Sequence, residues 1–327
     1  MDKVLSVSIA AYNIEKFIDK CLGSFISPEL AEGIEVIVVS DGSTDNTVRI
    51  AKKYEEQYPS LFRVIEKENG GWGSTVNAGL AAATGRYFRL LDGDDYYINE
   101  NLRDFVRYLD KSTDDLVITP YRTFDDESGI LLDEIRYNKA IEPRRSYHIE
   151  EVQNSLLVAM HACTFKTKQL QSKGIHITEK CFYTDVEYVL KGVNVSDTVS
   201  FFDLPIYMYR LGRAEQSVSV DSLIRRYKEH LKVLEGLLKY EREDLAEGKR
   251  QLFRKRMTEM VSIQYSIFLN MKPTSTIQRE LKDFDLNILN NYPHYDVTDS
   301  RRLHLMRKTG YKGLSLIYLL GRVKGSR

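Results

Sequence analysis

An apolar run leads directly into a cluster of carboxylates in the segment Tyr87-Phe88-Arg89-Leu90-Leu91-Asp92-Gly93-Asp94-Asp95. Residues 87–91 are typical of a buried strand. Carboxylate oxygens at the end of such a strand suit a divalent cation, and that cation would hold the phosphates of a nucleotide. Because Asp and Gly are also common turn residues, the cluster alone leaves an acidic turn as an alternative.

Strand and helix patterns alternate upstream of this segment. The β-rich runs at residues 4–10, 35–39 and 62–65 are each followed by a helical stretch. This alternation predicts an α/β fold with a mostly parallel sheet sandwiched by helices. In such sheets ligands bind outside the carboxyl ends of the strands. Those ends carry residues 11–13, 41–43, 69–74 and 92–95, so we expect these loops to form one nucleotide site.

Composition limits the classes of function. Basic and acidic residues balance at 47 each, which argues against nucleic-acid binding. The three cysteines are widely separated and lack CxxC spacing, so we expect neither disulfides nor a zinc site. The N-terminal run lacks the basic start of a signal peptide, and no apolar stretch reaches the ~20 residues of a membrane span. We expect a cytoplasmic protein, soluble or peripheral at the inner face of the membrane.

Four motifs, taken together, resemble glycosyltransferase family 2. They are Tyr12-Asn13, Asp41-Gly42-Ser43-Thr44-Asp45, Asn69-Gly70-Gly71 with Asn77-Ala78-Gly79, and Asp92-Gly93-Asp94-Asp95. The resemblance implies the GT-A fold, a Rossmann-like domain that binds a nucleotide-activated sugar, most often a UDP-sugar, and inverts the anomeric carbon. It implies a transferase of the bacterial surface-glycan type.

The resemblance also implies roles for individual residues. Asp41 would accept a hydrogen bond from the base, and it could also cap the helix that follows, since the two roles can coexist. Asp94 would be the principal ligand of Mn²⁺ or Mg²⁺, with Asp92 facing the ribose or the metal, while Asp95 would support the loop. The residues implied to bind the nucleotide sugar are Ala11, Tyr12, Asn13, Asp41, Asn69, Gly71, Asp92, Gly93 and Arg210.

An inverting transfer needs a base opposite the departing diphosphate. The family supplies it as the Asp of a Glu-Asp pair, and here Asp185 stands at that position with Thr184 in place of the Glu. Glu187 is the rival, but in a helix it would point about 200° away from Asp185, so both cannot face one hydroxyl. The alternative is that Asp185 caps the helix.

Several residues depart from the family pattern or leave two interpretations open. Val76 stands where an Arg is common, and Trp72, the one tryptophan, would stack on a sugar or simply pack. His161 falls where an acceptor pocket is expected, but a lone histidine is more often structural. Arg210 or Arg213 could reach the diphosphate or be a surface charge.

The pattern changes after residue 219, where long amphipathic stretches begin. We predict a nucleotide-sugar-binding and catalytic domain at residues 1–219 and a helical region at 220–327. The helical region would contact the acceptor, a second copy of the chain or a membrane. Residues 300–327 carry eight basic residues, no acidic one and a short apolar cluster, which suits anionic lipid or a packed terminal helix.

The leading expectation is a metal-dependent transferase that moves a sugar from a nucleotide diphosphate to a hydroxyl of a surface polysaccharide, glycoprotein glycan or lipid-linked acceptor. A non-catalytic nucleotide-sugar-binding or scaffold protein is the alternative, since Val76 and Thr184 depart from the family. A sugar nucleotidyltransferase should carry a Gly-rich loop with a basic residue after the first strand, and residues 10–16 do not provide it.

Overall fold

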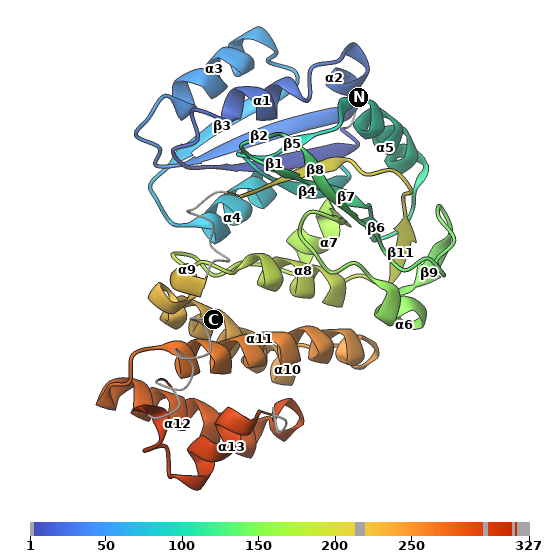
Figure 1. Ribbon diagram of the computed structural model, residues 1–327. Coiled ribbons are helices and arrows are strands. Elements are labelled where there is room, and N and C mark those ends of the chain that lie inside the picture. Colours follow the sequence, from blue (N-terminus) through green and yellow to red (C-terminus); the bar gives the residue numbers. More distant parts are fainter. Residues whose placement is uncertain (1–2, 213–219, 297–299, 316–317, 319–327) are drawn as a thin grey trace. The chain divides into compact units, whose positions relative to one another are not determined.

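A computed structural model describes residues 3–212, 220–296, 300–315 and 318 of the chain (Figure 1). It divides into two compact units, Met1–Arg213 and Ala214–Arg327. The first is a mixed α/β unit and the second is helical, as the sequence predicted. The division of roles predicted at residues 219 and 220 stays a prediction.

The first unit is built on an eight-stranded sheet in the order β3-β2-β1-β4-β10-β6-β11-β9. Its first four strands run parallel: β1 (Leu5–Ala11), β2 (Ile34–Asp41), β3 (Phe62–Lys67) and β4 (Tyr87–Asp92). Strands β1 and β4 are buried along nearly their whole length, which is typical of a parallel sheet covered on both faces. The register pairs Ala10 with Asp92 and Ala11 with Ser40, so three strand ends lie side by side.

The remaining strands extend this sheet and form a second one. Antiparallel β10 (Cys163–Lys166) lies between β4 and β6 (Leu116–Ile118), and β11 (Thr198–Phe201) and β9 (Ser146–His148) complete the edge. The second sheet has the order β5-β12-β7-β8. Its strands are β5 (Tyr96–Tyr97), β12 (Tyr207–Leu211), β7 (Tyr121–Asp125) and β8 (Leu131–Ile135).

Helices cover both faces of the central sheet (Figure 1). They are α1 (Ile18–Gly23), α2 (Pro28–Gly33), α3 (Thr47–Gln57), α4 (Trp72–Ala82), α5 (Asn99–Lys111), α6 (Ile149–Val152), α7 (Thr167–Ser172) and α8 (Asp185–Asn194). Helix α4 packs on β1 and β2. The packing is close enough that a Cβ on Gly79 would lie 1.9 Å from the Ser8 Oγ, so α4 needs a glycine there.

The second unit contains α9 (Val220–Arg225), α10 (Tyr227–Glu243), α11 (Arg250–Asn270), α12 (Ser275–Asn291) and α13 (Arg301–Lys308). Asp285 is fully buried and accepts hydrogen bonds from Tyr265, Tyr311 and Arg307. Arg307 is one of the basic residues of the segment for which the sequence left open a membrane contact or a packed helix, and here it pairs with Asp285 and Asp296 within the unit. Residues 316–317 and 319–327 of that segment lie outside the described residues. Among the helices that the structure describes, none has the length and apolar character needed to cross a membrane.

Two glycine substitutions should change stability in opposite directions. Gly79→Ala should lower the free energy of unfolding by about 1–3 kcal/mol, because the added methyl group overpacks α4 against β1. Gly236→Ala should raise it by about 0.5–1 kcal/mol, because a Cβ at this position in α10 would enter open space and alanine favours the helix. Urea unfolding would test both, with Trp72 fluorescence following the first unit and circular dichroism the helices. A stabilised Gly79→Ala chain would contradict the close packing.

Candidate active site

The loops after β1 and β2 are tied to each other. Asn13 has a left-handed backbone, with φ of 50°, and its side-chain oxygen accepts a hydrogen bond from the Thr44 N–H at 2.8 Å. The Asn13 N–H in turn donates to the Ser43 hydroxyl at 3.3 Å. Tyr12 beside it is half exposed. These contacts fix the predicted nucleotide-binding residues 11–13 beside the end of β2.

Asp41, at the end of β2, anchors the Gly-rich loop that precedes α4. Its Oδ1 accepts a hydrogen bond from the Gly70 N–H and its Oδ2 one from the Gly71 N–H, each at 2.8 Å. Lys67 Nζ donates to Oδ1 at 2.9 Å, and the Asn69 amide donates to the Asp41 carbonyl. The alternative that Asp41 caps the following helix α3 is wrong, because its carboxylate is directed to this loop instead. Its role at the base stays a prediction.

Asp92, at the end of β4, faces the first residue of α4. The indole N–H of Trp72 donates to Asp92 Oδ1 at 2.7 Å. The neighbouring Gly93 packs closely on β1, since a Cβ there would lie 2.9 Å from the Ala10 carbonyl oxygen and would also displace the end of the Ile14 side chain. The sequence left two roles open for Trp72, stacking on a sugar or packing, and neither involves the indole N–H. This hydrogen bond to Asp92 is therefore a contact that the sequence did not predict.

Asp95 is buried and binds the loop after β4, residues 92–95, to β12. One of its carboxylate oxygens accepts from the Tyr207 hydroxyl at 2.7 Å and the other from the Arg210 N–H at 2.8 Å. The Arg210 guanidinium donates to the Asp94 carbonyl at 2.7 Å and pairs with Asp126 at 2.6 Å. Arg210 therefore supports the loop, and its predicted contact with the diphosphate stays a prediction. Arg213 lies outside the described residues.

The acids influence one another strongly. Burial raises the pKa of Asp92 to about 7, and the negative charges of Asp94 and Asp185 add to this rise, against the opposing effect of the Trp72 hydrogen bond. Burial and the charges of Asp94 and Asp92 likewise raise the pKa of Asp95. Asp185, almost a hundred residues downstream, therefore lies close enough to act electrostatically on the end of β4.

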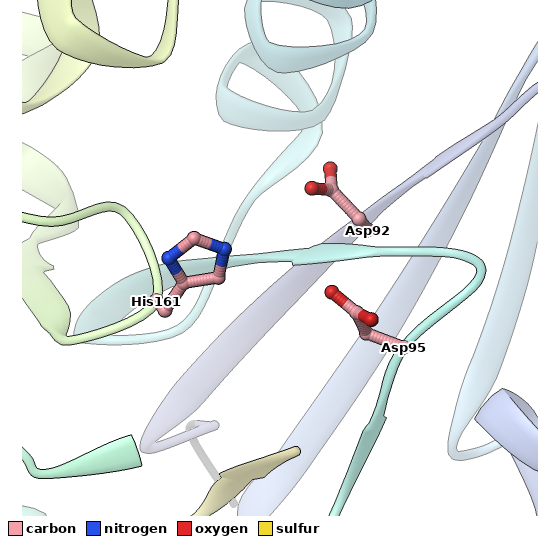
Figure 2. A group of neighbouring side chains, drawn as sticks. All are labelled: Asp92, Asp95 and His161. Carbon is pink, nitrogen blue, oxygen red and sulfur yellow. The ribbon is translucent and has the colours of Figure 1, made fainter. Parts of the chain in front are cut away.

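His161 lies with the acids and not in a separate pocket. Ligand atoms of Asp92, Asp95 and His161 lie within 4.8 Å of one another, and one ring nitrogen of His161 is turned toward the two carboxylates (Figure 2). The ring packs against Tyr209, Tyr207 and others, with 4.1 Å between the His161 and Tyr209 centroids. Burial, followed by the charge of Arg89, lowers the pKa of His161 to about 3, so the imidazole is neutral at pH 7.

This group has the chemistry of a divalent-cation site. Carboxylate oxygens suit Mg²⁺ and Mn²⁺, and a neutral imidazole adds a nitrogen ligand that first-row transition metals accept. The residues present therefore fit a metal such as Mn²⁺. The assignment of Asp94 and Asp92 as its ligands stays a prediction. Asp94 is not one of the three residues, Asp92, Asp95 and His161, whose ligand atoms lie within 4.8 Å of one another.

Asp185 and its rival Glu187 differ in their surroundings. Asp185 is the first residue of α8, and the N-cap residue of this helix is Thr184, not Asp185. Glu187 is buried and accepts hydrogen bonds from the Thr178 N–H at 2.9 Å and from Lys191 Nζ at 2.6 Å. Glu187 is therefore held in an internal network, which favours Asp185 as the base.

Comparison with known proteins assigns these motifs to a class of enzyme, the glycosyltransferases. The family profile described as Glycosyl transferase family 2 matches residues 6–169, half of the chain. The chain therefore belongs to glycosyl transferase family 2, as its motifs predicted.

Named relatives agree with this assignment. The chain is 26% identical over 292 residues to a protein of Bacillus subtilis (strain 168) named "Putative glycosyltransferase EpsH", and the match covers 84% of this chain and 79% of EpsH. It is 25% identical to Glycosyltransferase GlyA of Streptococcus pneumoniae serotype 4 and 30% identical to Minor teichoic acid biosynthesis protein GgaB of B. subtilis. Those matches cover 66% and 54% of this chain but 32% of GlyA and 19% of GgaB.

Solved structures show the same fold. S. aureus TarS 1-349 in complex with UDP-GlcNAc matches with a TM-score of 0.71 and 21% identity, over 97% of this chain and 92% of the 1-349 chain. The mannosyltransferase PcManGT from Pyrobaculum calidifontis, in complex with GDP-Man and Mn²⁺, matches with a TM-score of 0.51 and 14% identity, over 100% of this chain and 89% of that one. The predicted GT-A fold with C-terminal helices is thereby confirmed.

Metal affinity should depend on pH through Asp92. Its raised pKa means that a proton competes with the cation below about pH 7, so Mn²⁺ affinity should rise up to about tenfold per pH unit and level off above that value. Titration of free Mn²⁺ by electron paramagnetic resonance from pH 5.5 to 8.5 would measure this. Asp92→Asn should bind Mn²⁺ more weakly and remove most of the slope.

The metal-free chain should show the opposite trend in stability. Between about pH 4 and pH 7 the folded state binds a proton at Asp92 that the unfolded chain has lost, so the free energy of unfolding should fall as the pH rises through this window. A native-chain Mn²⁺ affinity that is flat from pH 5.5 to 7 would contradict the raised pKa.

Proposed function

We propose that the chain is an inverting glycosyltransferase that moves a sugar from a UDP-sugar to a hydroxyl of a bacterial surface polysaccharide or glycoprotein glycan. The observation that carries the proposal is the meeting of Asp92, Asp94, Asp95 and Asp185 at the carboxyl edge of the sheet, where the loops after β1 and β2 also lie. Such a cluster of carboxylates, of which Asp95 is buried, suits a cation that binds a diphosphate.

The residues divide the chemistry among them. Asp92 and Asp94, with His161 beside them, would hold Mn²⁺ or Mg²⁺, which neutralises charge on the departing diphosphate. Asp185 would accept the proton of the acceptor hydroxyl. The oxygen of that hydroxyl would bond to the anomeric carbon as the bond from this carbon to the diphosphate breaks. Residues 11–13 and Asp41 would bind the base, beside a loop that Asn69 and Gly71 shape.

The names of relatives support the substrate classes. TarS binds UDP-GlcNAc and PcManGT binds GDP-Man with Mn²⁺, so structures of this fold take nucleotide sugars and one takes a metal with its donor. GgaB belongs to teichoic acid biosynthesis by its name, which supports a cell-surface acceptor. The helical unit would contact that acceptor, a second copy of the chain or the membrane.

Release of nucleoside diphosphate from a panel of nucleotide sugars with Mn²⁺ would test the proposal. We expect one donor, a UDP-sugar, to be hydrolysed slowly without acceptor. Asp94→Ala should abolish this activity, and Asp185→Asn should lower it by about 10²–10⁴-fold, the contribution of a general base, with donor binding retained.

Asp110→Asn is a matched control, because Asp110 is an exposed acid at the end of α5 that pairs with Arg86. It should keep native activity. Undiminished release in Asp94→Ala would overturn the metal site, and binding of metal and donor without turnover on a broad acceptor panel would favour a scaffold protein.

A further inference from the structure

Residues 176–180, here called the bridging segment, contact both the Gly-rich loop with α4 and the helix α8. The segment lies just before the residues that lead into α8, which begins at Asp185. It contacts the Gly-rich loop and α4 on one side and α8 on the other. It thereby links the loop that Asp41 anchors with the helix that carries the proposed base.

Asn77 of α4 holds the bridging segment by a paired hydrogen bond. Its side-chain amide donates to the Ile177 carbonyl at 2.9 Å, and its side-chain oxygen accepts from the Ile177 N–H at 2.8 Å. The same amide donates to Glu179 at 3.0 Å. A planar amide that both donates to and accepts from one residue fixes its distance and its direction together.

The Gly-rich loop adds backbone contacts to the same segment. The Lys180 N–H donates to the Gly70 carbonyl at 2.5 Å. A Cβ on Gly73 would lie 2.2 Å from the Thr178 carbonyl oxygen, so the two backbones touch directly and α4 needs a glycine there. These contacts leave the segment little room to shift against α4.

Helix α8 grips the segment from the opposite side. Glu187 accepts from both the Thr178 N–H and its hydroxyl, at 2.9 and 3.2 Å. Lys191, one helical turn later, pairs with Glu187 and donates to the His176 carbonyl at 2.8 Å. Glu187 is therefore joined through two residues of the segment to Asn77.

The backbone is strained from the last residue of the bridging segment to the start of α8. Lys180 and Tyr183 adopt left-handed conformations, with φ of 52° and 67°, that residues with a Cβ rarely take. Such conformations persist only where surrounding contacts over-determine them, and they gather at functional sites. Both lie within five residues of Asp185, so the contacts of the bridging segment also maintain the conformation that starts α8.

We infer that Asn77 and Glu187 are positioning residues that set Asp185 relative to the donor, an inference that rests on the proposed role of Asp185 as the base. Asn77 acts from the donor side and Glu187 from the side of α8. The rate of transfer depends on the positions of the reacting groups to within about 1 Å. Loosening the contacts of Asn77 and Glu187 with the bridging segment should therefore slow the chemical step and leave donor binding intact.

A double-mutant cycle of Asn77→Ala with Asp185→Asn tests this inference. Asn77→Ala alone should lower kcat about 10–100-fold, while the Kd of UDP with Mn²⁺ stays within about threefold. In the Asp185→Asn chain the same change should cost less than about twofold, because a positioning residue has little left to position. Equal losses in both backgrounds, or weaker UDP binding in proportion to the lost rate, would overturn the inference.

Gln171→Ala is the matched control. Its amide donates to the Leu80 and Ala83 carbonyls at the C-terminal end of α4, and neither of these residues belongs to the bridging segment. It should keep native kcat.

Amide hydrogen exchange gives a readout that does not depend on activity. Asn77→Ala should speed exchange at Ile177, Lys180 and the first turn of α8, and Gln171→Ala should not. Unchanged exchange there in Asn77→Ala overturns the inference even if the proposed function holds. If instead Asp185→Asn keeps native turnover, the base assignment falls and the inference falls with it.

Glu187 variants provide a second route if Asn77→Ala does not fold. Glu187→Gln retains an acceptor for Thr178 and loses the charge that pairs with Lys191, whereas Glu187→Ala loses both. We expect Glu187→Ala to lower kcat at least about tenfold and Glu187→Gln to restore most of it, with UDP binding kept in both. An equal loss of UDP binding and kcat in Glu187→Ala would show a merely structural role.

Discussion

The candidate site depends on one buried carboxylate, that of Asp41, which receives the backbone N–H groups of a loop from elsewhere in the chain. This contact fixes residues 70–72 at the start of α4. From there Trp72 reaches Asp92 on one side, and Asn77, about one and a half turns further along α4, reaches the segment before Asp185 on the other. Strand ends that a parallel sheet merely brings near one another thereby become a site with fixed geometry.

Charge is distributed unevenly over this site. Asp95 and Asp92 are stabilised by neutral donors, a tyrosine hydroxyl with a backbone N–H for Asp95 and the indole of Trp72 for Asp92. In the part of the chain that the structure describes, neither Asp92 nor Asp95 forms an ion pair with Lys or Arg. The guanidinium of Arg210, which donates to the Asp94 carbonyl, pairs with Asp126 instead. Neutral donors orient carboxylates without cancelling their charge. The acids are thus oriented by neutral donors, and a cation that displaces the protons favoured by their raised pKa values would supply their counter-charge.

The sequence predicted the parts of the fold and site that follow from local pattern. Alternating strands and helices predicted the parallel sheet, and acidic residues at strand ends predicted which edge holds the site. Contacts between distant residues left no such signal. Asn77 and Ile177 are a hundred positions apart, and nothing local indicates that the indole N–H of Trp72 meets Asp92. The sequence left His161 open between an acceptor pocket and a structural role, because its neighbours alone cannot show that β10 runs back beside β4.

The observed role of Asp41 as loop anchor and its predicted role as acceptor for the base are compatible, because its two oxygens are used unequally. Oδ1 accepts from Lys67, Gly70 and Ser74, whereas Oδ2 accepts from Gly71 alone among the described residues. An ionised carboxylate offers about four lone-pair positions, two on each oxygen. Oδ1 is therefore saturated by the protein and Oδ2 keeps capacity for one more donor. A base N–H that binds Asp41 must approach Oδ2, on the side of the Gly71 backbone, and the loop that Asp41 anchors then also sets the direction from which the nucleotide enters.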